Sequence, residues 1–547
     1  MTGLLTRRTS VPGSTPLGRA ALEARSLAIL ARAGAVGVGS PAKVAEMLRT
    51  LGTFGAFGAA VHLAAIRHGG NIAITDDRGD LTYAEFDAQI NQLAHALLDL
   101  GLKPGDGVGI LCRNHRAPMI VGFAASRAGL RSLWLNTSFS ARQAREVCER
   151  EGVDLLVHDD EFSEALAEVQ PRFGKFSVDV TGAGAPDALD ELIAGGSPEM
   201  PSAPEKPGRI VLLTSGTTGT PKGAPRPDPR GFSLAAAVLE RMPMRSGQTT
   251  IMGPPIFHGT GMLIAILTIS LGSRLVLRPK FDPEQMLADI AEQRATTICV
   301  VPVMLQRMLD LGEDAIAEHD LSSLQCAFTA GSQLPAALSG RFQDAVGDVI
   351  YNLYGSTEVS IATLATPEEV RRYPTSVGRP ALGVRVRILD DRGEDVPQGA
   401  TGRIFVGTVT PFEGYTGGGG KEIIDGLMST GDVGHFDEAG RLYIDGRDDE
   451  MIVSGGENVF PREVEELLLT LDGVTDVAVL GADDEAFGQR LRAFLVLAEG
   501  AEVTEDQVKD YVRDNLARYK VPRDVLFLDE LPRNPTGKIL KRELALL

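Results

Sequence analysis

The stretch Thr214-Ser-Gly-Thr-Thr-Gly-Thr-Pro-Lys-Gly223 follows an apolar run, Ile210–Leu213, that is typical of a buried strand. Small residues let a backbone approach an anion closely. Backbone N–H groups and hydroxyls can then hold phosphate oxygens, and Lys222 adds positive charge. The spacing is not that of a Walker loop, which requires G-x-x-x-x-G-K-[ST]. The segment therefore predicts a strand that runs into a phosphate-binding loop of another kind.

Further motifs follow this loop in the chain. They are Tyr354-Gly-Ser-Thr-Glu358, Ser429-Thr-Gly-Asp-Val433, Gly446-Arg-Asp-Asp449 with Ser454-Gly-Gly-Glu-Asn458, and Pro535-Thr-Gly-Lys538. Each could be an ordinary turn if it stood alone. Together and in this order, they resemble the adenylate-forming superfamily: acyl-CoA synthetases, luciferases and peptide-synthetase adenylation domains. The resemblance covers about residues 70 to 547 and points most closely to fatty-acid–CoA ligases.

The resemblance implies ATP, Mg²⁺ and CoA as ligands, and it assigns roles to individual residues. Contacts with nucleotide, phosphate or pantetheine fall to Thr214, Ser215, Gly216, Thr217, Thr218, Gly219, Lys222, Gly331, Ser332, Tyr354, Gly355, Asp432, Arg447, Gly455 and Gly456. Catalytic roles fall to Lys538, His258, Thr357 and Glu358, with Glu358 and Thr214 as the Mg²⁺ ligands. A lysine beside the substrate carboxylate and the α-phosphate offsets charge that gathers in the transition state, and a carboxylate suits Mg²⁺.

The acid substrate is indicated by the segment Pro255-Ile-Phe-His-Gly-Thr-Gly261. It lacks the Asp with which amino-acid-activating relatives pair the α-amino group, so an amino acid is disfavoured. Small or apolar segments flank the expected channel, namely Gly259–Ile264, Cys299–Leu305 and Phe328–Ser332. An apolar lining favours a medium- to long-chain fatty acid. For His258 two roles stay open, a gate of the acyl channel and an ordinary structural histidine.

The fold expected is α/β. Apolar strands alternate with amphipathic helices up to about residue 383, where shorter hairpin-like strands begin. The prediction is a large N-terminal domain, 71–447, of packed mixed sheets and helices with a small β-barrel-like part. A small, mobile α+β C-terminal domain, 448–547, follows a hinge near Asp449. Residues 1–70 form a basic helical N-terminal extension outside the resemblance.

Charge and cysteines narrow the class of protein. The net charge of the 547 residues is −19, although residues 1–70 carry a net +6. So acidic a body does not suit a nucleic-acid binder. The four cysteines, at 112, 148, 299 and 326, form no CxxC pair, which disfavours a disulfide scaffold or a zinc site and fits the cytoplasm. The apolar positions Val44, Met47, Leu48, Leu51 and Phe54 recur at helical spacing. The extension either packs on the body or contacts a membrane surface or partner through residues 1–60.

The expected reaction has two steps. Fatty acid and Mg·ATP give acyl-adenylate and pyrophosphate, after which the small domain rotates about Asp449 and CoA takes the acyl group. Two alternatives stay open: a ligase that loads a carrier protein, and a non-catalytic acyl- or nucleotide-binding protein. The joint presence of Lys222, Glu358, Asp432, Arg447 and Lys538 argues against the second. The oligomeric state is left open.

Overall fold

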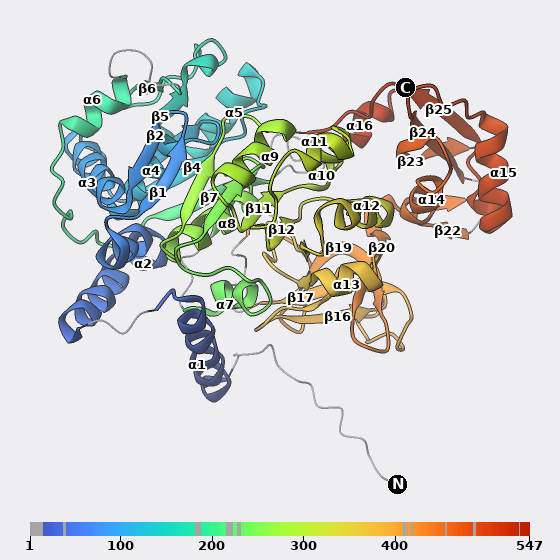
Figure 1. Ribbon diagram of the computed structural model, residues 1–547, viewed down its shortest axis with the longest axis horizontal. Helices are drawn as coiled ribbons and strands as arrows, with labels where there is room; N and C mark the ends of the chain where they lie inside the picture. The colour runs from blue at the N-terminus through green and yellow to red at the C-terminus, as the bar shows by residue number, and fades with distance from the viewer. Residues whose placement is uncertain are drawn as a thin grey trace, which may run out of the picture.

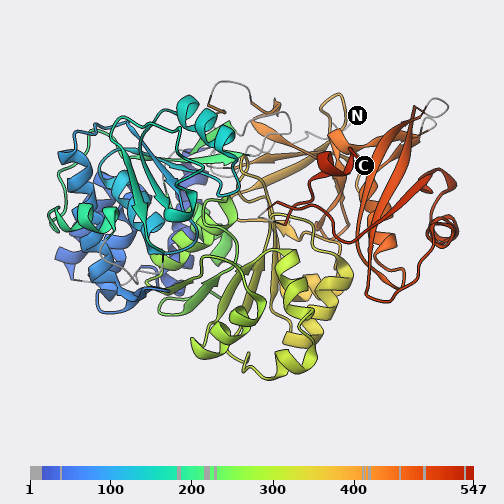
Figure 2. The same cartoon turned by 90° about the horizontal axis from the view of Figure 1, so that it is seen from above.

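The computed structural model describes residues 15–36, 40–180, 187–214, 222–226, 231–408, 412, 414–416, 420–454, 457–484, 488–534 and 537–547. A large N-terminal domain contains two extensive sheets and a smaller one, and a small C-terminal domain packs beside it (Figure 1). Seen from above, these bodies surround a common centre (Figure 2). The architecture is the mixed α/β fold with a large and a small domain that the sequence predicts.

A nine-stranded sheet forms one body of the large domain. Its order is β15(Arg379–Pro380), β14(Thr363–Ala365), β13(Ile350–Tyr354), β12(Cys326–Thr329), β11(Thr297–Val300), β9(Thr249–Met252), β10(Arg274–Leu277), β1(Ile72–Asp76) and β2(Gly79–Thr82). The strands from β13 to β1 run parallel, and β14, β15 and β2 add antiparallel edges. The helices of this body are α7(Ser233–Leu239), α8(Gly259–Ser270), α9(Pro283–Glu292), α10(Pro302–Leu309), α11(Glu313–Ala317), α12(Ala336–Val346) and α13(Pro367–Arg372).

A six-stranded sheet forms the second body. Its order is β6(Lys175–Val178), β5(Val153–Asp159), β3(Gly107–Leu111), β4(Arg131–Trp134), β7(Arg209–Thr214) and β8(Lys222–Arg226). All pairs are parallel except β7–β8, which the phosphate-loop motif joins. The helices are α3(Tyr83–Asp99), α4(Arg116–Arg127), α5(Ala141–Glu151) and α6(Ala188–Ala194). Apolar side chains of both sheets share one core, which joins the two bodies.

Local sequence explains how these elements begin. Helix α3 starts with a capping box in which Thr82 accepts from the Glu85 N–H, while the Glu85 carboxylate accepts from the Thr82 N–H. Phe86, Ile90 and Leu93 then recur on one face and are buried. The strand expected at Ile210–Leu213 is confirmed as part of β7, and the helix expected from the spacing of Val44 to Phe54 is confirmed as part of α2.

The N-terminal extension consists of two helices, α1(Pro16–Ala33) and α2(Pro41–His68). Helix α1 packs against α7, and α2 packs against α3, α4 and α8. A kink at Gly55 divides α2, because this residue has φ 73° and ψ 179°, a conformation that only glycine adopts readily. No helix in the described part of the chain is long and apolar enough to cross a membrane.

The last part of the large domain is a five-stranded antiparallel sheet, at the place where the sequence predicts a small β-barrel-like part. It contains β16(Arg385–Leu389), β17(Gly402–Gly407), β18(Ile423–Ile424), β19(Leu427–Phe436) and β20(Leu442–Arg447). The C-terminal domain has β21(Ile452–Ser454), β22(Glu457–Val459), β23(Val474–Asp484), β24(Gly488–Leu497) and β25(Asp524–Leu528) with helices α14(Pro461–Leu468), α15(Glu505–Asn515) and α16(Lys541–Leu544). A single 3₁₀ turn, Asp448–Glu450, lies between β20 and β21.

Candidate functional site

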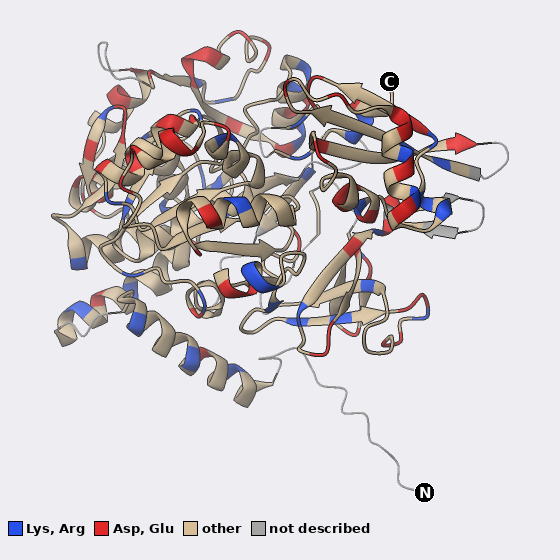
Figure 3. Ribbon diagram, turned by 45° about the vertical axis from the view of Figure 1, so that its right-hand side comes forward, with Lys and Arg blue, Asp and Glu red and all other residues tan. Residues whose placement is uncertain are grey.

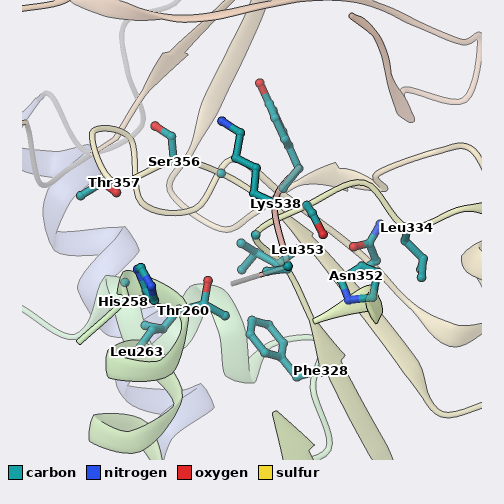
Figure 4. Close-up of a pocket in the computed structure, with 18 of the residues that line it drawn as sticks. His258, Thr260, Leu263, Phe328, Leu334, Asn352, Leu353, Ser356, Thr357 and Lys538 are labelled. Atoms are coloured by element: carbon teal, nitrogen blue, oxygen red, sulfur yellow. The ribbon is translucent and has the colours of Figure 1, made fainter. Parts of the chain in front are cut away.

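A cavity of about 2240 Å³ lies where the sheets and the C-terminal domain meet (Figure 4). It gathers side chains that are far apart in the sequence. The residues expected at the site that line it are Lys222, His258, Gly331, Ser332, Tyr354, Gly355, Thr357, Glu358, Asp432, Arg447 and Lys538. Thr214 ends β7, and its side chain lies outside the described atoms. Ser215, Gly216, Thr217, Thr218, Gly219, Gly455 and Gly456 lie outside the described residues.

Two polar side chains that line the cavity, Tyr354 and Asp432, come from different sheets and contact each other. The Tyr354 hydroxyl, at the end of β13, donates to Asp432 Oδ2 at 2.5 Å. Arg447 Nη1 donates to Asp432 Oδ1 at 3.2 Å, because β19 and β20 place these two residues opposite each other. Burial raises the pKa of Asp432, and the contacts with Tyr354 and Arg447 offset part of that effect. An aromatic ring beside a carboxylate held in this way fits the adenosine of ATP.

The turn after β13 brings a second carboxylate into the cavity. Gly355 is required there, because a Cβ atom would lie 2.0 Å from the Ser360 carbonyl oxygen. Ser356 Oγ donates to Glu358 Oε2 at 2.8 Å, and the Tyr415 hydroxyl donates to Glu358 Oε1 at 2.5 Å. Burial by itself would raise the pKa of Glu358, but these hydrogen bonds and the nearby Lys421 charge outweigh it and lower the pKa. An ionised carboxylate of this kind fits the oxygen coordination of Mg²⁺.

Three residues that the motifs do not single out lie at or next to this part of the cavity. Tyr415 holds Glu358, and its ring centroid lies 6.0 Å from Lys222 Nζ. Lys421 lines the cavity beside Glu358. Glu151 lies buried behind β8, where its Oε1 accepts from the Gly223 N–H at 3.3 Å and from Thr416 Oγ1 at 2.8 Å. The motif positions in the sequence carry no signal for these contacts, because each joins segments that lie far apart in the chain.

The C-terminal domain contributes Lys538 through a short turn. An isolated bridge pairs Arg533 with Ile539, the Gly537 N–H donates to the Asn534 carbonyl, and Asn534 Oδ1 accepts from the Lys538 N–H. Gly537 has φ 77°. Figure 4 shows the Lys538 side chain above Leu353, on the same side as Ser356 and Thr357. The structure therefore brings Lys538 and the β13 turn to one cavity.

His258 lies at the opposite side of the cavity, directly before α8. Its Nε2 atom is buried and has no hydrogen-bond partner among the described residues. Burial lowers the pKa of His258 to about 4, so the imidazole is neutral near pH 7. A buried polar atom without a protein partner fits a site where a ligand supplies one. Beyond it, α8 lines the cavity with Thr260, Leu263 and Ile266.

Comparisons with known proteins agree with this geometry. The family described as AMP-binding enzyme matches residues 61–416, and the AMP-binding enzyme C-terminal domain matches residues 463–538. A feruloyl-CoA synthase of an Amycolatopsis species is 33% identical over 496 residues, which cover 88% of this chain and 95% of the relative. The fatty acid–[acyl-carrier-protein] ligase ScoC of Streptomyces coeruleorubidus is 30% identical over 482 residues, 85% of this chain and 91% of the relative.

A solved structure extends the likeness to three dimensions. ATP-bound MatB from Rhodopseudomonas palustris matches with a TM-score of 0.81 and 27% identity, over 90% of this chain and 98% of that protein. Enzymes of this family use ATP and CoA, with Mg²⁺ as the usual ion, and their acids range from fatty to aromatic. The chain belongs to the adenylate-forming family of AMP-binding enzymes and is an AMP-forming acid–thiol ligase.

Proposed function

We propose that this enzyme is a fatty-acid–CoA ligase that acts on medium- to long-chain acids. The observation that carries the proposal is the apolar wall of the cavity, which begins beside His258 and continues along α8 through Leu263, Ile266 and Leu267. Phe328 faces the same space from β12 (Figure 4). Each methylene buried there contributes about 0.8 kcal/mol of binding free energy, so a longer alkyl chain gains progressively.

In the first step, a carboxylate oxygen of the acid forms a bond to the α-phosphorus of ATP, and the bond to the pyrophosphate oxygen breaks. Lys538 is proposed to hold the carboxylate and the α-phosphate together and to offset the negative charge that gathers there. Thr357 contacts the α-phosphate, and Asp432 with Arg447 holds the ribose. Glu358 and Thr214 would hold Mg²⁺, which supplies positive charge to the phosphate oxygens when bound.

His258 is proposed to act as the gate between the phosphates and the acyl channel. Because its imidazole is neutral, it does not draw a phosphate into the apolar channel. Its buried Nε2 is placed to exchange a hydrogen bond with the acid or the adenylate. The ring also packs against Phe257, with the centroids 4.4 Å apart, which holds the imidazole in place.

In the second step, the CoA thiol sulfur attacks the carbonyl carbon of the acyl-adenylate. The thiol proton is lost to solvent, the bond from carbon to the phosphate oxygen breaks, and AMP leaves. The domains proposed for this cycle are 71–447 and 448–547, with rotation at the Asp448–Glu450 turn near Asp449. Rotation would remove Lys538 and present the segment Gly455–Glu457 to the pantetheine. We place this reaction in the cytoplasm, in keeping with four cysteines that are free and buried.

The test is AMP release across straight-chain acids from C2 to C20 and a set of aryl acids, each with and without CoA. CoA-dependent release that peaks at a medium or long chain supports the proposal. A peak at an aryl acid would overturn the assignment of a fatty acid as substrate, while the assignment as an acid–thiol ligase would stand. Exchange of pyrophosphate into ATP without CoA-dependent turnover would favour the loading of a carrier protein, the acceptor named for the relative ScoC.

A further inference from the structure

We propose that the N-terminal extension forms the far wall and the mouth of the acyl cavity, where it receives the distal methylenes of the substrate chain. This inference rests on the proposed fatty-acid activity. It assigns a binding role to residues 27–36 and 40–60, which lie ahead of the segment that matches the family, residues 61–416. The extension would then set the longest acid that the enzyme uses efficiently.

The first support is continuity. Leu30 on α1, Val36 after the end of α1 and Leu51 on α2 line the same cavity as Lys538 and His258. Helix α8 connects these places, because it begins directly after His258 and packs against α2. A chain that leaves the carboxylate site along α8 therefore reaches the extension.

The second support is the kink in α2. Beyond Gly55 the inner half of the helix buries Phe57, Val61 and Ala64 in the shared core. The outer half projects from the body (Figures 1 and 3). Phe54 is buried, but two other apolar residues of this half are exposed: Leu48 is 64% exposed and Val44 is 40% exposed, and both line the cavity. Contiguous exposed apolar side chains of this kind mark a surface that awaits an apolar partner.

The third support is the chemistry of the lining. Every lining residue that the extension contributes is apolar except Arg67. The Arg67 guanidinium donates to the Gly34 carbonyl at 2.9 Å and to the Ser270 carbonyl at 2.7 Å, so it ties α1, α2 and α8 together. With its charge engaged in this way, the remaining wall has no side chain to pair with a polar ligand. A hydrocarbon chain is the occupant that this wall fits.

Helix α1 is anchored to the body, as a wall requires. The Glu23 carboxylate accepts from the Phe232 N–H at 2.9 Å, and Arg25 pairs with Glu240 at the end of α7. The Ser246 N–H donates to the Ala33 carbonyl at 2.8 Å. These contacts hold the cavity side of α1, including Leu30, against the body.

The experiment measures kcat/KM for AMP release with acids from C4 to C18, without detergent, first without vesicles and then with phosphatidylglycerol vesicles. Leu48→Asp places a charge at the mouth, and Ala60→Phe narrows the wall further inside. Since each methylene contributes about fourfold to kcat/KM, we expect Leu48→Asp to lower the ratio of hexadecanoate to butanoate about tenfold. Ala60→Phe should reduce kcat/KM for shorter acids as well. The longest acid used efficiently should therefore be shorter in Ala60→Phe than in Leu48→Asp. Leu17→Asp is the matched control, because Leu17 is 87% exposed on α1 and does not line the cavity.

If the wild type uses hexadecanoate and the ratio of kcat/KM for hexadecanoate to that for butanoate is unchanged in Leu48→Asp and Ala60→Phe, the extension does not form the wall. The proposed fatty-acid activity would then still stand. Equal losses for butanoate and hexadecanoate would also overturn it, because they indicate general damage. If Leu17→Asp and Leu48→Asp lose turnover together, and only when phosphatidylglycerol vesicles are present, the extension is a membrane-contact surface instead. If the wild-type enzyme uses no fatty acid, the proposed function is wrong, and the proposed role of the extension is wrong as well.

Discussion

The Tyr354 hydroxyl and the Asp432 carboxylate, 78 residues apart in sequence, meet in a 2.5 Å hydrogen bond. The bond joins the end of β13 in the nine-stranded sheet to β19 in the antiparallel sheet. The bond fixes the orientation of the Asp432 carboxylate, which Arg447 also contacts. Burial raises the pKa of this carboxyl group. The proposed adenosine site is thus preorganised across two sheets, which reduces the conformational freedom lost when the nucleotide binds.

Removal of that hydroxyl should weaken ATP binding. A hydrogen bond to a charged group contributes about 1.5 kcal/mol, so Tyr354→Phe should raise the KM for ATP about tenfold. The measurement is pyrophosphate exchange at varied ATP. Tyr351→Phe is the control, since this tyrosine lies on the same strand and does not line the cavity. Equal KM values for the two variants would show that the bond has no part in nucleotide binding.

Lys538 should matter in one half-reaction only. Lys538→Ala should slow adenylation by about a hundredfold or more, because a charge-stabilising donor is lost. Thioester formation from supplied acyl-adenylate should remain close to wild type. Lys509→Ala, on α15 of the same domain and paired with Glu505, serves as the control. Comparable losses in both half-reactions would contradict the two roles of the rotating domain.

Glu151 should position the phosphate-loop strand without touching substrate. Glu151→Ala removes the side-chain acceptor of the buried Gly223 N–H and one of the two acceptors of the Thr416 hydroxyl, which also donates to the Gly223 carbonyl at 3.2 Å. We expect a loss of about 1–3 kcal/mol in the free energy of unfolding, together with a raised KM for ATP. Glu149→Ala, on the exposed face of the same helix, should change neither quantity. Recovery of the KM by Glu151→Gln, which keeps an acceptor oxygen, would separate positioning from charge.

His258 should make the fold less stable in acid. Its pKa is about 4 in the folded protein and about 6.5 when unfolded. The unfolded state therefore binds the proton more tightly, and stability that is fully present above pH 6.5 is lost as the pH falls toward 4. When the pH is lowered from 7 to 5, the free energy of unfolding measured in urea should fall by about 2 kcal/mol less in His258→Gln than in the wild type. His319→Gln, outside the cavity, is the control, and the same pH response in both variants would rule out His258 as the source.

Much of the architecture could be predicted from the sequence, because strands and helices follow from residues that are neighbours in the chain. The apolar run at Ile210–Leu213 predicts β7, and the spacing from Val44 to Phe54 predicts the outer half of α2. What that second pattern faces could not be predicted. Periodicity shows that a helix has an apolar face, but only the arrangement of α1, α2 and α8 turns this face toward the cavity.

The sequence by itself determined the family and the candidate residues of the site, since each motif is a short local segment that can be recognised without knowledge of the fold. Only the tertiary structure decided which of these residues contact one another and which further residues contact them. Tyr415 reaches Glu358, and Glu151 lies behind Gly223, because the packing of separate sheets brings distant segments together. Contacts of this kind depend on the whole core, where each side chain is placed by many others, and no local pattern records them.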